Sequence, residues 1–528
     1  MNRTIVCIAA LSIFFLANSC TDDFTELNTD PKNLTVDNLT QSEYGAVVKA
    51  AQYSPAFLGS PGPFQLTQSL FSDIYGGYFA TTAPNFNSDK FILVGGWLNG
   101  AFNSFYANAA PQIKYVEDFA ADNGFDLENA MMKVWRVWSY HRMTDYWGPI
   151  PYSEFGNGEL SVPYDSQEDI YRDFFTTLDE AISVLQSNAG ANSFLGGNDL
   201  VYGGNADQWL KFANTMRLRL AIRVKYADPT LSQTEAEKAA ALGQFIDDNA
   251  DIATIETNPD FRNPYNTITQ WGEFRISADM ESVLKGYEDP RMQFYAAPAD
   301  EADPSDDPTG VEFPFEGMRN GQSQVAKQGT NFNAIASDMA PNYTEAGAPG
   351  PSYVVMNAAE SYFLRAEGAL EGWNMGGGTA QDFYEQGIVV SHVEYGLDGN
   401  DLSGNPYVQS TNTPASYNGS DPAPSEVPIA FNTGGSTEEQ LEQIITQKWI
   451  SLYPNSQEAW AEKRRTGYPT FYDRLNTDDP TIPVNTVPRR VTFVDGEFTT
   501  NAAAVNAAID SQLGGPDNGT TRLWWDAK

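Results

Sequence analysis

The 528-residue sequence has little of the side chains on which many catalytic and metal sites depend, since it contains only two cysteines and two histidines. Cys7 lies inside a hydrophobic N-terminal segment, and Cys20 follows that segment. A mature chain that begins at Cys20 can form no internal disulfide, so its stability must come from packing. The HExxH, paired CxxC, GxSxG and phosphate-loop patterns are absent as well. The enzyme and zinc-binding classes that carry these motifs are therefore disfavoured.

Basic residues are also scarce, because 31 lysines and arginines stand against 69 aspartates and glutamates and give a formal net charge of −38. Such a surface repels phosphate backbones, which excludes nucleic acid as a partner. It also repels anionic headgroups, so a membrane could hold this chain only through a lipid. No segment after the N-terminus is apolar for long enough to span a bilayer. The body of the protein is expected to lie outside the membrane.

The N-terminal segment predicts export. Residues 5–16 form an apolar run that is too short to cross a membrane. We predict a lipoprotein signal peptide at 1–19, a lipid on Cys20 and a polar tether over 20–40. A lipoprotein signal usually has leucine three residues before the cysteine, where this chain has Ala17. An ordinary secreted protein that is cut nearby is therefore the alternative.

Hydrophobic side chains recur every three or four residues in several segments, as on one face of a helix. Such stripes run from Leu127 to Trp138, from Ile170 to Ile182 and from Trp209 to Val224. Further helices are expected at 354–372, 380–394, 438–453 and 456–466. The intervening stretches are rich in Gly, Pro, Asn and Asp, and they cover 58–96, 188–204, 257–275, 295–352 and 396–436. We predict a mainly α-helical frame of paired helices that carries long irregular loops, which are usually functional.

The few candidate catalytic and metal-binding residues have structural explanations. His141 falls on the same apolar stripe as Trp138, so we expect it in the core, and His392 has no cysteine or second histidine near it in the sequence. The acidic cluster at 303–307 lacks the spacing and the closing glutamate of a calcium loop. We predict no metal ion and no cofactor. Two glycosidase carboxylates could be present among 69 acidic residues, so a glycan hydrolase stays open.

Several segments, in order along the chain, resemble one family. They are 20–31, 144–152 (TDYWGPIPY), 216–223 (MRLRLAIR), 359–367 (AESYFLRAE), 447–450 (QKWI), 458–469 (EAWAEKRRTGYP), 488–490 and 521–526. Together they make the sequence similar to the SusD/RagB family, the surface lipoproteins of Bacteroidetes nutrient-uptake systems, and to its SusD-like second subgroup. Each segment alone is weakly specific, whereas the whole set in this order is specific.

The resemblance implies a single SusD-like nutrient-binding domain over 41–528, in which tetratricopeptide-type helix pairs support irregular loops. It also implies display on the cell surface at the outer membrane, favoured by the acidic pair at 22–23, with a SusC-like TonB-dependent transporter as partner. The family binds its nutrient non-covalently and has no catalytic residues to carry over. Its motif side chains are expected to be structural, with Trp147, Trp449 and Trp460 in the core and Arg464 and Arg465 paired with helix carboxylates or carbonyls.

Aromatic residues are abundant, with 26 Tyr, 31 Phe and 11 Trp, and aromatic faces stack on sugar rings. The stretches 71–97 and 257–275 combine aromatics with Gly, Asn and Asp. The expected ligand-binding residues are Tyr75, Tyr78, Phe86, Trp97, Trp271 and Phe274. The amides of Asn263, Asn266 and Gln270 are expected to contact sugar hydroxyls. Packing of these rings within small loop cores is the structural alternative.

The sequence thus predicts a non-enzymatic, surface-anchored lipoprotein that binds an oligosaccharide and passes it to the transporter. Aromatic and amide side chains could hold a peptide backbone equally well, so a peptide, a glycopeptide or another nutrient is the first alternative. A glycan hydrolase is the second alternative. An adhesin or assembly component without a small ligand is the third.

Overall fold

The computed structural model describes residues 40–528, apart from 160, 302–313, 399–405 and 420. The chain divides into two units, with the boundary between Ala46 and Val47. In the first unit, Thr40 and Glu43 cap the start of helix α3 (Gln41–Ala56), since the amide of Thr40 donates to Glu43 Oε2 at 2.7 Å. The expected signal peptide, Cys20 and most of the tether lie outside the described residues and stay predictions.

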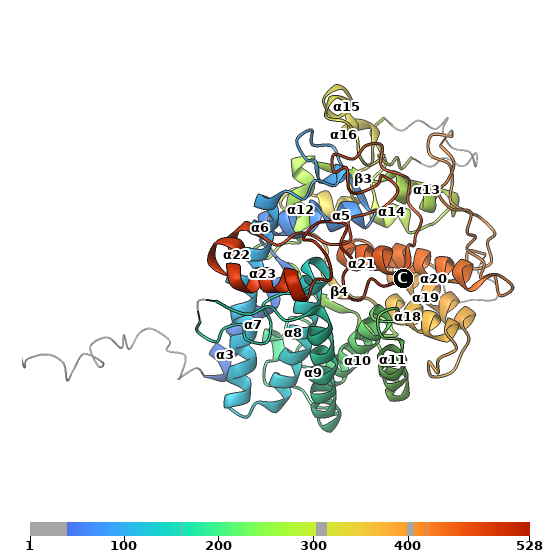
Figure 1. The fold of residues 1–528 in the computed structure, drawn as a ribbon. Coiled ribbons are helices and arrows are strands. Elements are labelled where there is room, and N and C mark those ends of the chain that lie inside the picture. The colour runs from blue at the N-terminus through green and yellow to red at the C-terminus, as the bar shows by residue number, and fades with distance from the viewer. Residues whose placement is uncertain (1–39, 160, 302–313, 399–405, 420) are drawn as a thin grey trace, which may run out of the picture. The chain divides into compact units, whose positions relative to one another are not determined.

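The unit 47–528 is mainly helical, as predicted, and its long helices form neighbouring pairs (Figure 1). Those of the first half are α6 (Gly95–Ser104), α7 (Ala110–Asp122), α8 (Asp126–Trp147), α9 (Gln167–Ser187), α10 (Ala206–Arg223) and α11 (Pro229–Leu242). Those of the second half are α18 (Ala358–Leu370), α19 (Ala380–Glu394), α20 (Thr437–Leu452), α21 (Ser456–Thr466) and α23 (Ala502–Ser511). Consecutive helices from α7 to α11 pack side by side, and α18 packs on both α19 and α20. No helix in the described part is long and apolar enough to span a bilayer.

Short elements occupy much of the chain between the long helices. The short α-helices are α4 (Pro61–Phe64), α5 (Ser72–Tyr75), α12 (Pro264–Ile268), α13 (Ala278–Gly286), α14 (Met292–Tyr295), α15 (Gln324–Gly329), α16 (Phe332–Ile335), α17 (Pro341–Thr344) and α22 (Asp495–Thr500). Tighter or wider helical turns are η2 (Gln65–Ser69), η3 (Ser88–Lys90), η4 (Phe105–Ala109), η5 (Gly196–Asn198), η6 (Asn249–Asp251) and η7 (Thr269–Trp271). Two antiparallel strand pairs join β1 (Phe79–Thr81) to β3 (Phe274–Ile276) and β2 (Ala253–Ile255) to β4 (Tyr353–Met356). The predicted irregular stretches are thus partly ordered.

The helices expected from the sequence are confirmed with one correction. The three hydrophobic stripes lie on α8, α9 and α10. Helices α19 and α21 have the expected bounds, whereas α20 both begins and ends one residue earlier than expected. The helix expected at 354–372 begins only at Ala358, because the preceding residues form β4. The side chain of Asn357 caps this helix by accepting from the amide of Glu360 at 3.0 Å. The Tyr-Val-Val-Met run of β4 favours a strand because aromatic and β-branched side chains pack well on a sheet.

The stretch 58–96, expected to be an irregular loop, is largely ordered and buried. Its helix α5 carries Asp73, which is only 1% exposed. The Asp73 carboxylate accepts hydrogen bonds from Tyr265 Oη at 2.9 Å, from Gln68 Nε2 at 3.3 Å and from Ser456 Oγ. These donors are uncharged and do not fully offset desolvation, so burial raises the pKa of Asp73 to about 6.

A buried ion-pair network joins α10, α18 and α21. Arg219 Nε donates to Glu360 Oε1 at 2.7 Å, and the Arg223 guanidinium donates to Glu458 Oε1 and Glu462 Oε1, both at 2.6 Å. None of these five side chains is more than 4% exposed. Burial opposes ionisation of Glu458, but the neighbouring cations outweigh it and hold its pKa at about 2. Glu458 is therefore ionised at neutral pH.

The same network reaches a second point on α18 through Arg465. The Arg465 guanidinium donates to Glu367 Oε1 at 2.6 Å and to Glu462 Oε2 at 2.5 Å. Lys225 Nζ lies 2.8 Å from Glu367 Oε1. From α20, Lys448 Nζ lies 3.6 to 3.8 Å from three carboxylates of the network. Four helices from three separate parts of the sequence are thus tied together by buried charges.

The expected structural roles of the motif residues are confirmed. The exposed fraction is 0% for Trp147, 1% for Trp449 and 0% for Trp460. Arg464 Nη1 donates to the backbone carbonyl of Asp145 at 2.6 Å. The three motif tryptophans therefore lie in the core of the helical frame.

Replacing Arg465 by methionine tests the network. The substitution leaves two carboxylates buried with fewer counter-charges, so we expect the free energy of unfolding to fall by about 3–5 kcal/mol in urea titrations. Lys114→Met is the control, because the Lys114–Asp118 pair is 42% and 55% exposed. An exposed pair contributes about 0–1 kcal/mol. Equal small losses of unfolding free energy in both variants would contradict the role of Arg465 in the buried network.

Asp73→Asn tests the buried carboxylate. Because folding raises the pKa of Asp73 from 3.8 to about 6, the stability that its protonation contributes is present at low pH and lost as pH rises through this window. Asparagine does not titrate. We expect the wild type to lose roughly 1–3 kcal/mol of unfolding free energy relative to Asp73→Asn between about pH 4 and pH 7. Urea unfolding of both proteins across this pH range measures the difference in unfolding free energy. A difference that does not change with pH would disprove the raised pKa of Asp73.

Candidate ligand-binding site

The pairing of β1 with β3 brings two distant aromatic stretches together. Thr81 lies opposite Phe274 in the register of this strand pair. Beyond the strands, the amide of Thr82 donates to Glu273 O at 2.9 Å, and Thr82 Oγ1 donates to Gly272 O at 2.7 Å. The chain that follows β1 therefore runs beside the turn that precedes β3.

Three of the six expected ligand-binding residues form one aromatic group at this position. The ring centroids of Phe86 and Trp97 are 5.4 Å apart with an interplanar angle of 76°, and those of Phe86 and Phe274 are 6.0 Å apart. Phe86 and Trp97 are half-buried, whereas Phe274 is 9% exposed. Trp271 lies in η7, in the turn just before β3, and is 41% exposed. We call Phe86, Trp97, Trp271 and Phe274 the aromatic site.

Tyr75 and Tyr78 do not belong to this site. Both are 0% exposed. The Tyr78 ring stacks on Trp449 at a centroid distance of 5.2 Å and its hydroxyl donates to Trp449 O at 2.6 Å, while the Tyr75 ring lies 5.4 Å from that of Trp460. Neither tyrosine has a ring face open to a ligand, so the prediction for these two residues is wrong. Their partners are core tryptophans of α20 and α21.

Exposed amides lie near the aromatic site. Asn85 directly precedes Phe86, Gln270 directly precedes Trp271, and both residues are exposed. The Gln270 Nε2 also donates to the backbone carbonyl of Thr344 at 2.6 Å. Gly272 has φ +65°, and a side chain there would meet Asn333 Nδ2 at 3.1 Å, so the exposed Asn333 amide sits against this turn. The other two expected amides are structural, because Asn263 and Asn266 are 3% and 1% exposed. Their side chains donate to backbone carbonyls.

Two short helices beside this site were missed by the sequence analysis. Helix α15 approaches it through Gln324, whose Nε2 donates to Asn85 Oδ1 at 3.2 Å. Helix α16 carries Asn333. Ser323 caps α15 by accepting from the Ala326 amide at 3.1 Å, and a capping serine is a signal that a sequence can reveal. A helix of six residues is too short, however, to give a periodic pattern.

Cations adjoining the aromatic residues are already paired. Arg275, which follows Phe274, has its Nη1 3.2 Å from Asp338 Oδ2. Lys90 forms an ion pair with Asp478. No group of three or more His, Cys, Asp or Glu side chains that could hold a metal ion occurs among the residues that the structure describes. The site offers apolar ring faces and amides, which suit an uncharged polar ligand such as a sugar.

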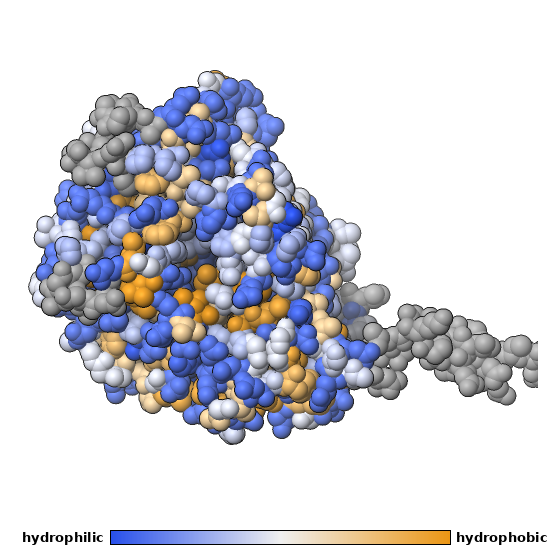
Figure 2. Space-filling view, turned by 180° about the vertical axis from the view of Figure 1, so that it is seen from behind, coloured by the Kyte–Doolittle hydropathy of each residue, from blue (hydrophilic) through white to orange (hydrophobic). Residues whose placement is uncertain are grey.

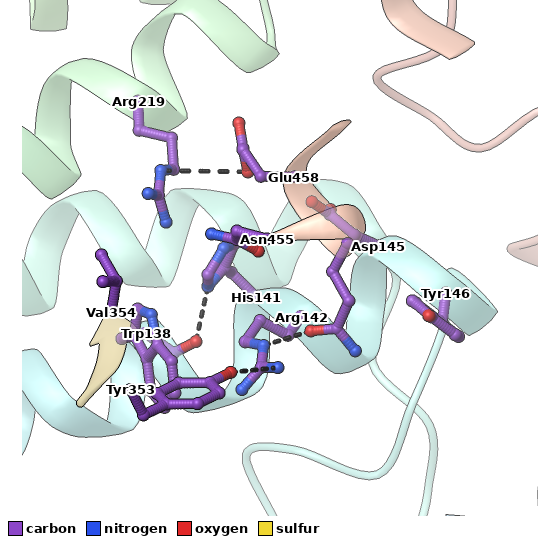
Figure 3. A pocket seen from close by; sticks show the side chains of 11 residues that line it. Trp138, His141, Arg142, Asp145, Tyr146, Arg219, Tyr353, Val354, Asn455 and Glu458 are labelled. Carbon is purple, nitrogen blue, oxygen red and sulfur yellow. Dashed lines mark hydrogen bonds and ion pairs between the residues drawn. The ribbon is translucent and has the colours of Figure 1, made fainter. Parts of the chain in front are cut away.

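A cavity in the interior collects polar and charged side chains (Figure 3). His141 Nδ1 lies 2.6 Å from Trp138 O, and Arg142 Nη2 donates to Tyr353 Oη at 3.1 Å. Burial, assisted by Arg219, lowers the pKa of His141 well below its usual range, so the imidazole is neutral. With about 10 Å³ of space, this cavity holds at most one water molecule. The expectation that His141 is a core residue is confirmed.

A larger depression lies elsewhere on the unit 47–528. It offers about 570 Å³ and is lined by residues that include Tyr287, His392, Tyr407 and Asn412. Its lining extends to both ends of 399–405, which lie outside the described residues. Figure 2 shows the molecule from behind the view of Figure 1. This face is hollowed near its middle, and hydrophobic side chains gather there among hydrophilic ones. The aromatic site combines half-buried and exposed aromatic side chains with exposed amide residues, and we take it as the candidate site.

Comparisons with known proteins give one family. The model of the SusD-like family, described as SusD and RagB outer membrane lipoprotein, matches residues 26–526. Among solved structures, a chitin-binding SusD homologue from Flavobacterium johnsoniae is 37% identical, with a TM-score of 0.80 over 91% of this chain and 98% of the other. A SusD homologue from Bacteroides vulgatus is 31% identical, with a TM-score of 0.81 over 91% and 97% of the two chains.

A further solved structure, named a chitin-binding protein, is 27% identical, with a TM-score of 0.73 over 91% of this chain and all of the other. No curated protein matches the sequence. The family model spans almost the whole chain, and the helical architecture agrees with that of the solved homologues. The resemblance seen in the sequence motifs is thereby confirmed. The chain belongs to the SusD/RagB family.

Proposed function

We propose that this protein is a cell-surface lipoprotein that binds an oligosaccharide non-covalently and passes it to a TonB-dependent outer-membrane transporter. The observation that carries the proposal is the aromatic site, where Phe86, Trp97 and Trp271 offer partly exposed rings beside exposed amides. Aromatic rings stack on the apolar faces of sugars, and amides both donate to and accept from hydroxyl groups. Family membership supports glycan binding in general terms.

Chito-oligosaccharides are the first ligands to test. Two of the similar structures are named as chitin-binding proteins. A chain of N-acetylglucosamine is uncharged, so it needs no counter-charge from a site whose neighbouring cations are already paired. Its acetamido groups can both donate and accept hydrogen bonds, which matches the exposed Asn85, Gln270 and Asn333 amides.

Membrane attachment and transfer rest on the family and on the N-terminal sequence. The family is described as an outer membrane lipoprotein. A lipid on Cys20 would hold the protein at the outer membrane, and a polar tether of about twenty residues would allow it to move over a transporter. Mass spectrometry of the native N-terminus and co-purification of a transporter barrel from outer membranes test these two parts separately.

Affinity-gel electrophoresis of residues 21–528 tests the ligand class. The panel contains glycol chitin, other neutral and acidic polysaccharides, and a parallel arm of peptide mixtures. We expect retardation by glycol chitin without release of reducing sugar. Capture of peptides with no retardation by any glycan would replace the oligosaccharide by a peptide, and release of reducing sugar during the run would mean that the protein is a hydrolase.

Trp271→Ala tests the aromatic site itself. Loss of one stacking ring should weaken chitohexaose binding by about 1–3 kcal/mol, by analogy with bases stacked on aromatic side chains. This corresponds to a roughly five- to 150-fold higher Kd in isothermal titration calorimetry. Phe194→Ala is the matched control, because Phe194 is 39% exposed and packs on Phe125 at a centroid distance of 5.0 Å. Equal affinity of the two variants would remove Trp271 from the site.

A further inference from the structure

We infer that Lys327 is a positioning residue for the aromatic site. It holds the segment that carries Phe86 and does not itself contact the ligand. The inference rests on the proposed function and deepens it. Lys327 lies on α15, more than 200 residues after Phe86 in the sequence, and its ammonium group holds the segment that carries that ring. Affinity for the ligand should therefore depend on a side chain that the ligand does not reach.

The contacts of Lys327 fix the segment at two points. Its Nζ donates to the backbone carbonyl of Phe86 at 3.2 Å and lies 2.8 Å from Asp89 Oδ2. The side chains of Lys327 and Asp89 are 1% and 0% exposed. One buried cation thus binds the backbone of the aromatic residue and the carboxylate three residues later. A buried pair of this kind has a defined geometry, because neither group can turn to water.

The surroundings of Lys327 show that packing does not explain its burial. Lys327 is the buried residue of α15, whereas Gln324, Val325 and Gln328 on the same helix are exposed, Val325 by 78%. A helix that buried itself for hydrophobic reasons would turn its valine inward and its lysine outward. Instead, α15 is attached to the segment 85–89 by polar contacts, and Gln324 adds a second one through Asn85.

The far end of the same segment is held independently. Lys90 pairs with Asp478, whose backbone amide donates to Lys90 O at 2.8 Å. Phe91, directly after η3, has φ +69° and is fully buried. Removal of Lys327 would therefore release the Phe86 end of the segment while the Phe91 end stays fixed. Phe86 would lose its orientation against Trp97, and the stacking surface would be disordered.

A double-mutant cycle tests this role. Lys327→Met, Phe86→Ala and the double variant are titrated with chitohexaose by calorimetry. We expect Lys327→Met to raise Kd by about two- to 30-fold, the range for residues that act on a site without touching its ligand. In the Phe86→Ala background the same substitution should have little further effect, because its action passes through that ring. An equal loss in both backgrounds, or no loss in either, would overturn the inference.

Controls separate positioning from general stability. Arg217 lies on α10, far from α15 in the sequence, and forms a buried ion pair with Glu235. Arg217→Met should therefore lower the melting temperature without changing the Kd for chitohexaose. Lys327→Arg keeps the cation and should retain part of the affinity that methionine loses. If Phe86→Ala and Trp271→Ala both bind chitohexaose like the wild type, the aromatic site of the proposed function is wrong, and the inference falls with it.

A measurement without ligand tests the structural part of the inference by itself. Hydrogen–deuterium exchange of peptides covering 82–91 should be faster in Lys327→Met than in the wild type, while peptides of α8 keep their protection. Arg217→Met should not change exchange over 82–91. Unchanged exchange over 82–91 in Lys327→Met would overturn the inference even if no tested glycan binds.

Discussion

The buried ion-pair network between α10, α18, α20 and α21 is the constraint on which the helical frame depends. A charge moved out of water is costly unless an opposite charge meets it with good geometry. Arg219, Arg223 and Arg465 meet glutamates that are at most 4% exposed. These helices therefore have few alternative arrangements, because sliding one of them would strand several charges at once. The network fixes the frame more narrowly than hydrophobic packing alone would.

The aromatic site uses the same physical device on a smaller scale and for a different purpose. The segment that carries Phe86 is held by the buried pair of Lys327 with Asp89 and by Lys90 with Asp478. Because these cations are paired within the protein, a ligand bound at the proposed aromatic site would meet mainly rings and amides. A fixed ring surface also loses little conformational entropy when a ligand binds. The high negative charge of the chain then favours solubility and does not exclude an uncharged ligand.

Much of the frame could be predicted from the sequence, whereas only part of the site could. The helical stripes on α8 and α10 and the buried roles of Trp449 and Trp460 follow from local periodicity and family motifs. Tyr75 and Tyr78 were misassigned because their ring partners lie on α20 and α21, more than 350 residues away, which no local pattern reveals. For the same reason, the pairing of β1 with β3 and the approach of α15 could not be foreseen.

The most direct test of the account is a crystal structure of residues 21–528 soaked with chitohexaose. The account predicts sugar rings against Trp271 and Phe86, with acetamido groups hydrogen-bonded to neighbouring amides and the helical frame unchanged. Sugar bound instead in the depression lined by Tyr287 and Tyr407, with the aromatic site empty, would contradict it.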